Sequence, residues 1–134
     1  MKKEIITPAA VAKPAAPYAT AIKVSGAGSL VFVSGVVSSD LSGRIIHPGD
    51  ILAQTRQAVE NLIATLEAAG VKPANVVKTT TYVVNSAMQP FFETRAYLEA
   101  LTPFQTTDTL VGVAGLAGSE QGQLIEIDAI AATQ

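Results

Sequence analysis

Two acidic residues near the end of the chain are the strongest candidates for catalysis. In residues 124–130, Leu-Ile-Glu-Ile-Asp-Ala-Ile, apolar and acidic residues alternate. An extended strand directs successive side chains to opposite faces, so Glu126 and Asp128 should share one face. A half-buried carboxylate has a raised pKa and is suited to general acid or base catalysis. The same alternation also fits a strand with one solvated face, so the spacing alone does not identify a site.

The elements that would position these residues begin with strands. Runs of apolar and β-branched residues predict strands at residues 19–25 and 29–37, with a weaker one at 3–7. Gly26-Ala27-Gly28 separates the two stronger runs and has the composition of a hairpin turn. Between the weak strand and the first strong one, the prolines of residues 7–17 predict an extended N-terminal arm.

The rest of the chain predicts two helices among three strands. Apolar or small residues recur at steps of three and four over residues 50–69, which is typical of an amphipathic helix. Residues 76–84 are rich in Val and Thr and predict a strand. A Ser-x-x-Gln capping box predicts the start of a second helix over 86–101. Strands at 107–114 and 123–131 follow.

The predicted order, β-β-β-α-β-α-β-β, indicates one α+β domain over residues 1–134, with both helices on one face of a mixed sheet. Two helices cannot cover both faces. Residues 30–37 and 76–84 nevertheless offer apolar groups on both sides, which predicts that the uncovered face packs against other subunits. The low charged share, 15% against roughly a quarter in typical soluble proteins, fits such hidden surface.

Composition also excludes several functions. Nine basic against eleven acidic residues give a net charge of −2, which disfavours nucleic-acid binding. The absence of cysteine and the single histidine, His47, argue against disulfides, thiolate chemistry and the common metal sites. The glycines of residues 111–115 lack the P-loop lysine. We therefore expect no cofactor, and the lack of a membrane span or signal peptide predicts a cytoplasmic protein without a membrane partner.

Motifs along nearly the whole chain carry a family resemblance. They are Pro17-Tyr18-Ala19-Thr20-Ala21, Val31-Phe32-Val33-Ser34-Gly35, the helical positions Gln54, Asn61, Leu66 and Ala69-Gly70, Val77-Lys78-Thr79-Thr80-Thr81-Tyr82, and Glu126-Ile127-Asp128-Ala129-Ile130-Ala131. In these the chain resembles the RidA family, also called YjgF/YER057c/UK114, of enamine and imine deaminases. The resemblance implies a chorismate-mutase-like fold assembled as a homotrimer. It also implies a small-molecule substrate, a 2-imino or 2-enamino acid, that binds in clefts between subunits and is converted by water to a keto acid and ammonia.

The resemblance assigns roles to particular residues. Glu126 matches the acid that orients the attacking water, and Tyr18 matches a tyrosine that lines the cleft and could supply a proton. Ser34, Gly35 and the backbone of Leu110 match groups that hold the substrate.

Departures from the family pattern concern the same cleft. The family's Pro-Ala-Arg-Ser, whose Arg binds the substrate carboxylate, aligns with residues 106–109, so Asp108 replaces the Arg. An attractive bidentate contact is thereby exchanged for repulsion. Asp108 would favour a substrate with a cationic or hydrogen-bond-donating group, or act as a second acid or base with Glu126. The family's Asn appears as Thr94, and the Gln after Ser-Gly appears as Val36.

Three cations could replace the missing Arg: Arg95, Arg44 and His47. Each also fits an ordinary solvated surface position. The leading hypothesis is therefore an Arg-lacking imine or enamine deaminase with altered substrate choice. A catalytically slow trimeric ligand-binding or regulatory protein of the same fold is the alternative. An endoribonuclease or translation inhibitor is disfavoured by the acidic composition.

Overall fold

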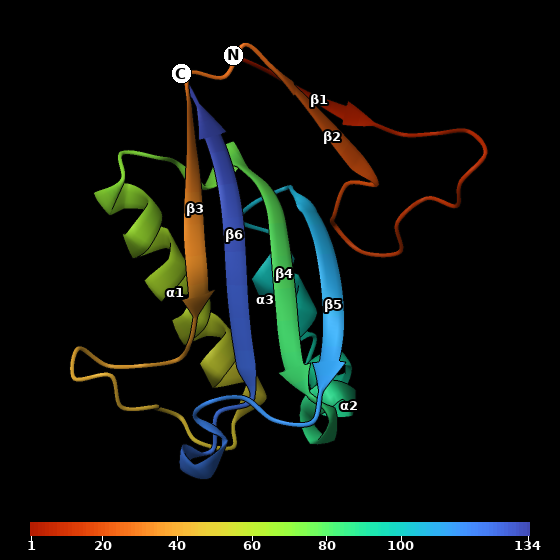
Figure 1. The fold of residues 1–134 in the computed structure, drawn as a ribbon. Coiled ribbons are helices and arrows are strands. Elements are labelled where there is room, and N and C mark those ends of the chain that lie inside the picture. The colour runs from red at the N-terminus through yellow and green to blue at the C-terminus, as the bar shows by residue number, and fades with distance from the viewer.

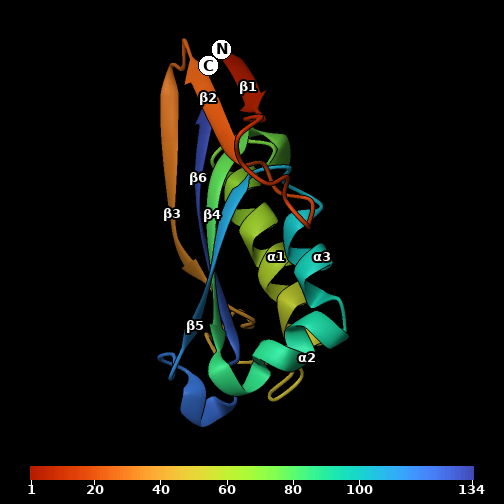
Figure 2. The same cartoon turned by 90° about the vertical axis from the view of Figure 1, so that its right-hand side faces the viewer.

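A four-stranded mixed sheet with helices on one face forms the body of the protein (Figure 1, Figure 2). The structure is a computed structural model that describes residues 1–134. Across the sheet the strands follow the order β3 (Ser29–Val36), β6 (Ile125–Thr133), β4 (Val76–Val84) and β5 (Thr107–Val113). Strand β6 runs antiparallel to both of its neighbours, whereas β4 and β5 are parallel. A helical crossover joins the parallel pair, as parallel neighbours require. Strand β5 is the last in the order and therefore forms one edge of the sheet.

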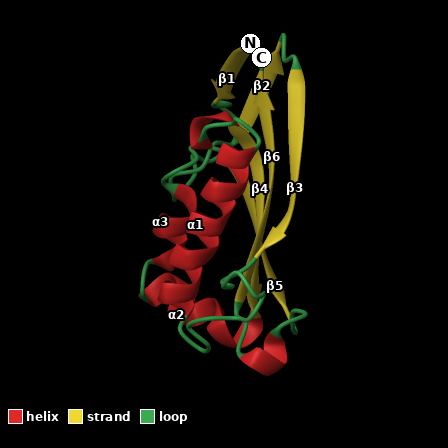
Figure 3. Cartoon of the chain, turned by 90° about the vertical axis from the view of Figure 1, so that its left-hand side faces the viewer, coloured by secondary structure: helices red, strands yellow, loops and turns green.

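All helices lie on the same side of this sheet (Figure 3). They are α1 (Ile51–Ala68), α2 (Met88–Glu93) and α3 (Ala96–Leu101), with short 3₁₀ turns η1 (Pro73–Asn75), η2 (Asn85–Ala87) and η3 (Ser119–Gln121). None of them combines the length and the apolar character needed to cross a membrane. The opposite face of the main sheet is left uncovered by helices, as the sequence predicts.

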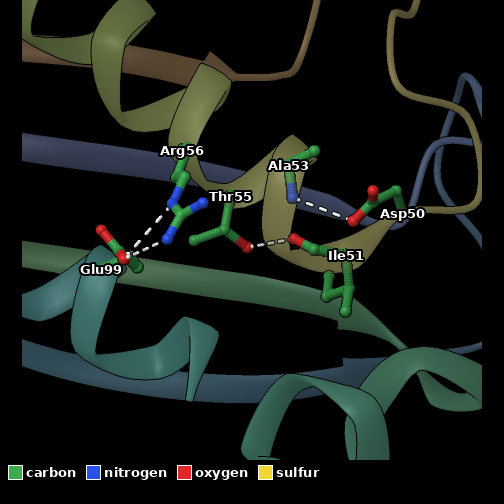
Figure 4. Close-up of polar contacts among 6 residues, drawn as sticks. All are labelled: Asp50, Ile51, Ala53, Thr55, Arg56 and Glu99. Carbon is green, nitrogen blue, oxygen red and sulfur yellow. Dashed lines mark hydrogen bonds and ion pairs between the residues drawn. The ribbon is translucent and has the colours of Figure 1, made fainter. Parts of the chain in front are cut away.

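Helix α1 provides much of the core. Asp50 caps it, since its carboxylate accepts a hydrogen bond from the Ala53 N–H at 3.0 Å, and Arg56 forms an ion pair with Glu99 of α3 at 3.0 Å (Figure 4). The apolar stripe of α1 includes the fully buried Leu62 and Leu66. These side chains belong to one core cluster with the inward residues of β4 and β6, so the predicted amphipathic helix is confirmed.

Strand β6 alternates as its sequence predicts. Ile125, Ile127 and Ala129 are buried beneath the helices, while Glu126 and Asp128 are half-buried on the open face. The shared face of the two acids is thus confirmed.

The second helix is not continuous, and the prediction of one helix over residues 86–101 is wrong. Arg95 adopts a left-handed conformation, with φ 61° and ψ 26°, between α2 and α3. Ser86 lies in η2 and does not cap α2, which begins at Met88 without a side-chain cap. The break redirects the chain so that Ala96 and Ala100 both pack into the core, 0% and 3% exposed, and this burial offsets the cost of about 1 kcal/mol for a left-handed non-glycine residue.

The predicted hairpin around Gly26-Ala27-Gly28 is also wrong. Strand β2 (Ala21–Ser25) pairs with β1 (Lys2–Ile6) in a separate two-stranded sheet, not with β3. Figure 1 shows this small sheet near the end of the main sheet where both termini lie. The Lys3 ammonium holds it there by donating to the carbonyls of Ala74 and Val76 at 2.8 and 2.9 Å. Partial burial at this contact lowers the pKa of Lys3.

Candidate functional site

On the open face of the sheet, the carboxylate of Glu126 lies against the backbone of Gly35. A Cβ atom placed on Gly35 would come within 2.5 Å of Glu126 Oε2, so a larger residue at that position would displace the carboxylate. Tyr82 of β4 stands directly opposite Glu126 in the strand register. Cross-strand neighbours on one face lie within side-chain contact of each other, so a phenol and a carboxylate share this part of the sheet.

A β-bulge creates the approach of Gly35 to Glu126. Val33 pairs with Ala129 and Val36 with Ile127, so β3 has one residue more than β6 between these pairs. The bulge leaves Ser34 exposed next to Gly35 and turns Val36 back toward the core, against which it packs. Bulges of this kind commonly occur beside functional sites, where they redirect a side chain or bring backbone close to a ligand.

On the opposite face of the sheet, Asp108 of β5 is held by two threonine hydroxyls. Its Oδ1 atom accepts hydrogen bonds from Thr79 Oγ1 at 2.7 Å and from Thr81 Oγ1 at 2.9 Å. Both threonines belong to β4 and are buried, 1% and 2% exposed. The Asp108 side chain therefore points toward the helices, away from the face that carries Glu126.

A cavity of about 300 Å³ opens beside Asp108, between β5, the α2–α3 region and the N-terminal arm. Its lining is mostly apolar and consists of Ala15, Ala16, Tyr18, Thr81, Phe91, Phe92, Tyr97, Ala100, Leu101, Asp108 and Leu110. The ring of Phe92 lies 5.8 Å from that of Phe91 and 5.4 Å from that of Tyr97, measured between centroids. Asp108 is the one charged group in this aromatic enclosure.

The site residues predicted from the sequence thus fall into separate places. Tyr18, Asp108 and Leu110 line the cavity on the helix side. Glu126 and Gly35, with the neighbouring Ser34, lie at the open face. Within one chain the sheet separates Asp108 from Glu126, so they cannot serve as an acid–base pair on one substrate atom of that chain.

Thr94 lies apart from both groups. It caps the C-terminal end of α2, is exposed, and its hydroxyl donates to the Pro90 carbonyl at 2.6 Å. This contact is local to the helix. The residue lines neither the cavity nor the face that carries Glu126.

A model of the family described as Endoribonuclease L-PSP matches residues 8–133. The chain belongs to the L-PSP family. Among L-PSP relatives, the RutC family protein PH0854 of Pyrococcus horikoshii is 38% identical over 96% of this chain and 97% of its own. A 2-iminobutanoate/2-iminopropanoate deaminase of Dermatophagoides farinae is 29% identical over 96% of this chain and 94% of its own. The 3-aminoacrylate deaminase RutC of Acinetobacter baylyi is 41% identical over 52% of this chain and 53% of its own.

Solved structures of Rid and YjgF/YER057c/UK114 family proteins share this fold. The Rid family protein YyfB from Yersinia pestis has a TM-score of 0.82 and 31% identity, covering 98% of this chain and 99% of that one. Rv2704 from Mycobacterium tuberculosis, a member of the YjgF/YER057c/UK114 family, has a TM-score of 0.62 and 26% identity, covering 98% of this chain and 100% of that one. The predicted RidA-like α+β fold and family membership are confirmed.

Several residues of this L-PSP chain were not foreseen as parts of a site. From the sequence, Tyr82 is expected only to pack within the strand at residues 76–84. In the structure it pairs with Glu126 of β6. Thr79 and Thr81, which hold Asp108, share one face of β4 by alternation. That alternation was a usable signal, but only the pairing of β4 with β5 shows which residue they contact.

None of the three cations considered as replacements for the family Arg lines the cavity beside Asp108. Arg95 is exposed at the α2–α3 break, and His47 is exposed ahead of α1. Arg44 lies in a loop organised by Asp40, whose pKa is lowered first by a hydrogen bond from the Ser42 hydroxyl and then by the Arg44 backbone N–H.

Proposed function

We propose that this protein hydrolyses imines or enamines, with Glu126 positioning and deprotonating the attacking water. The observation that carries the proposal is the half-buried Glu126 carboxylate, seated against Gly35 and opposite Tyr82. A carboxylate fixed by close packing can hold a water in one orientation. Relatives named as 3-aminoacrylate and 2-iminobutanoate/2-iminopropanoate deaminases support this reaction class.

The reaction needs one water and no oxidant. Water adds to the carbon of the C=N bond while its proton passes to Glu126, which gives a carbinolamine. Return of a proton to nitrogen breaks the C–N bond and releases ammonia, leaving a carbonyl product. Tyr82, opposite Glu126 in the strand register, would supply one phenol beside the reacting water, and Tyr18 of an adjoining copy would provide a second.

The separation of Asp108 from Glu126 supports a site completed by two copies of the chain. The open face exposes apolar side chains beside Glu126, with Phe32 71% and Leu30 57% exposed. Phe32 pairs with Ile130 and continues an apolar surface across β3 and β6. Burial of this surface would drive association, and a homotrimer with substrate clefts between subunits is the assembly that we propose.

Replacing Phe32 by Glu is expected to break this assembly, because a charge would be buried at its centre. Sedimentation equilibrium should show a particle of three times the 13.8 kDa chain mass for the natural protein and a single-chain mass for the variant. Val11→Glu, at an exposed position of the N-terminal arm, is the matched control and should stay associated. A monomeric natural protein at micromolar concentration would refute the proposed trimer.

Substrate choice should differ from that of carboxylate-binding relatives, because Asp108 occupies the cavity without any cation. We expect 2-aminoacrylate-derived imines to be hydrolysed no faster than the background reaction in a coupled assay of keto acid release. Asp108→Arg should create measurable acceleration by supplying a bidentate partner for the carboxylate. Rapid hydrolysis of these imines by the natural protein would show that Asp108 does not set substrate choice.

The reaction class itself is tested with a panel of imines and enamines, with and without carboxylates, generated in solution and followed by ammonia release. The proposal is supported if the natural protein accelerates hydrolysis of at least one compound of the panel and the Glu126→Gln variant does not. If no member is accelerated while small molecules still bind the cavity, the protein is instead a ligand-binding member of the family.

A further inference from the structure

The Asp108 carboxylate presents one unused oxygen to an aromatic cavity. Its Oδ1 atom accepts both threonine hydroxyls, whereas Oδ2 takes part in none of the side-chain hydrogen bonds within the chain. The two threonines thus fix the orientation of the carboxylate and leave one oxygen to meet a ligand. Neutral hydroxyl donors compensate a partly buried charge only in part.

The walls of the cavity favour a positive charge. The rings of Phe92 and Tyr97 lie 5.4 Å apart, and Tyr18 enters from the N-terminal arm. The faces of aromatic rings attract cations, and the attraction grows when water is excluded. No lysine, arginine or histidine lines the cavity, so the charge of Asp108 has no partner there within the chain.

The size and lining of the cavity restrict the ligand further. A volume of about 300 Å³ is at the lower end for small-molecule sites. Nine of the eleven lining residues are hydrophobic, which suits one apolar group of the size of a benzyl or branched alkyl group. A ligand carboxylate would meet the Asp108 charge without a compensating donor.

We propose that the cavity binds a primary ammonium or iminium ion that carries an apolar substituent and no carboxylate. Its chemical step rests on the proposed function: R–CH=NH₂⁺ and water give R–CHO and NH₄⁺, with a C–O bond formed and the C–N bond broken. Such iminium ions arise by two-electron oxidation of primary amines. The substrate would therefore be supplied by an amine-oxidising reaction, whereas the relatives named above act on imino or enamino acids.

Three probes that share a 2-phenylethyl group and differ in the charge of the group attached to it are compared in a calorimetric titration of the full-length protein. They are 2-phenylethylammonium, the neutral 2-phenylethanol and the anionic 3-phenylpropanoate. We expect the ammonium to bind at least ~10-fold more tightly than either of the others, as a charge-assisted hydrogen bond in an apolar site would give. Asp108→Asn keeps an oxygen acceptor for the two threonines and should remove this preference without weakening 2-phenylethanol binding.

Two results would overturn the inference: binding of 3-phenylpropanoate as tight as that of the ammonium, or an unchanged ammonium affinity in Asp108→Asn. If Asp108→Asn fails to fold, Phe92→Ala substitutes for it, because Phe92 is 48% exposed. This variant should weaken the ammonium and 2-phenylethanol together, and an unchanged affinity for both would refute the cavity as the site.

The activity of Glu126→Gln separates this inference from the proposed function. That variant should bind 2-phenylethylammonium normally but fail to accelerate hydrolysis of the phenylacetaldehyde imine formed in solution. Selective ammonium binding without acceleration by the natural protein would refute the proposed hydrolysis and leave the ligand class standing.

Discussion

Replacing Glu126 by Gln is expected to lower kcat for imine hydrolysis by about 10²–10⁴-fold, with little change in KM. Glutamine keeps the size of the side chain and an oxygen acceptor, but it cannot take a proton from water. The effect should therefore fall on the chemical step, since substrate recognition is assigned to the opposite face. Initial rates of ammonia release over a range of imine concentrations separate kcat from KM.

Glu67→Gln is the matched control. Glu67 is an exposed carboxylate on α1, on the helix side of the sheet, and it does not line the cavity beside Asp108. It should retain the natural rate. Asp128→Asn, on the same face as Glu126, shows whether the second acid contributes to the reaction. A Glu126→Gln variant with the natural kcat would exclude Glu126 as the base.

Gly35→Ala should reduce kcat even though Glu126 is retained. The added methyl group would lie 2.5 Å from Glu126 Oε2 and must push the carboxylate aside. Misplacement of a catalytic group by about 1 Å can cost about 10²-fold in rate. Ala27→Gly, in the turn before the opposite end of β3, tests a change of one methyl group away from Glu126 and should leave the rate unaltered.

Gln54→Leu should have the largest effect on stability, a loss of about 2–3 kcal/mol in the free energy of unfolding. The fully buried Gln54 amide donates to the carbonyls of His47 and Gly122 at 2.9 and 2.7 Å, and its oxygen accepts from the Leu124 N–H at 2.8 Å. Leucine fills a similar volume but removes all three bonds. The Leu124 N–H is then left without a partner, at a cost of about 1–3 kcal/mol, whereas the carbonyls of His47 and Gly122 each keep a backbone donor, the N–H groups of Asp50 and Gly49. Urea unfolding measures the difference.

Gln57→Leu is the comparison for this stability prediction. Gln57 lies one turn further along α1, is half-buried, and donates a single side-chain hydrogen bond, to Asn61 Oδ1 at 3.0 Å. Its replacement should cost under about 1 kcal/mol. Equal losses in the two variants would show that the bridge formed by Gln54 is not a special source of stability.

Elements encoded by a local repeat could be predicted from the sequence. The apolar periodicity of α1 and the two-residue alternation of β6 each reflect which side chains face one core. These patterns predict the helix, the strand and the common face of Glu126 and Asp128 without information on strand pairing. The predicted strand at residues 76–84 coincides with β4 for the same reason.

Features that depend on pairing or on single backbone angles could not be predicted. The partner of β2 is decided by contacts between segments distant in sequence, such as that of Lys3 with Ala74 and Val76. Arg95 is not a residue type that marks a left-handed helix break. The orientation of Asp108 could not be inferred either, because small or apolar residues occupy both faces of β5 and its alternation is weak.

The opposed positions of Asp108 and Glu126 have a consequence for how such proteins diversify. In the function proposed above, the cavity residues that select the substrate and the glutamate that drives the reaction lie on different sides of the sheet of each chain, so mutations in either set leave the packing of the other undisturbed. Saturation mutagenesis around the cavity should therefore reorder substrate preferences, whereas changes near Gly35 should scale all rates together. Under the proposed function, a lineage can thus acquire a new substrate through a few exchanges in the cavity while it inherits its chemistry unchanged.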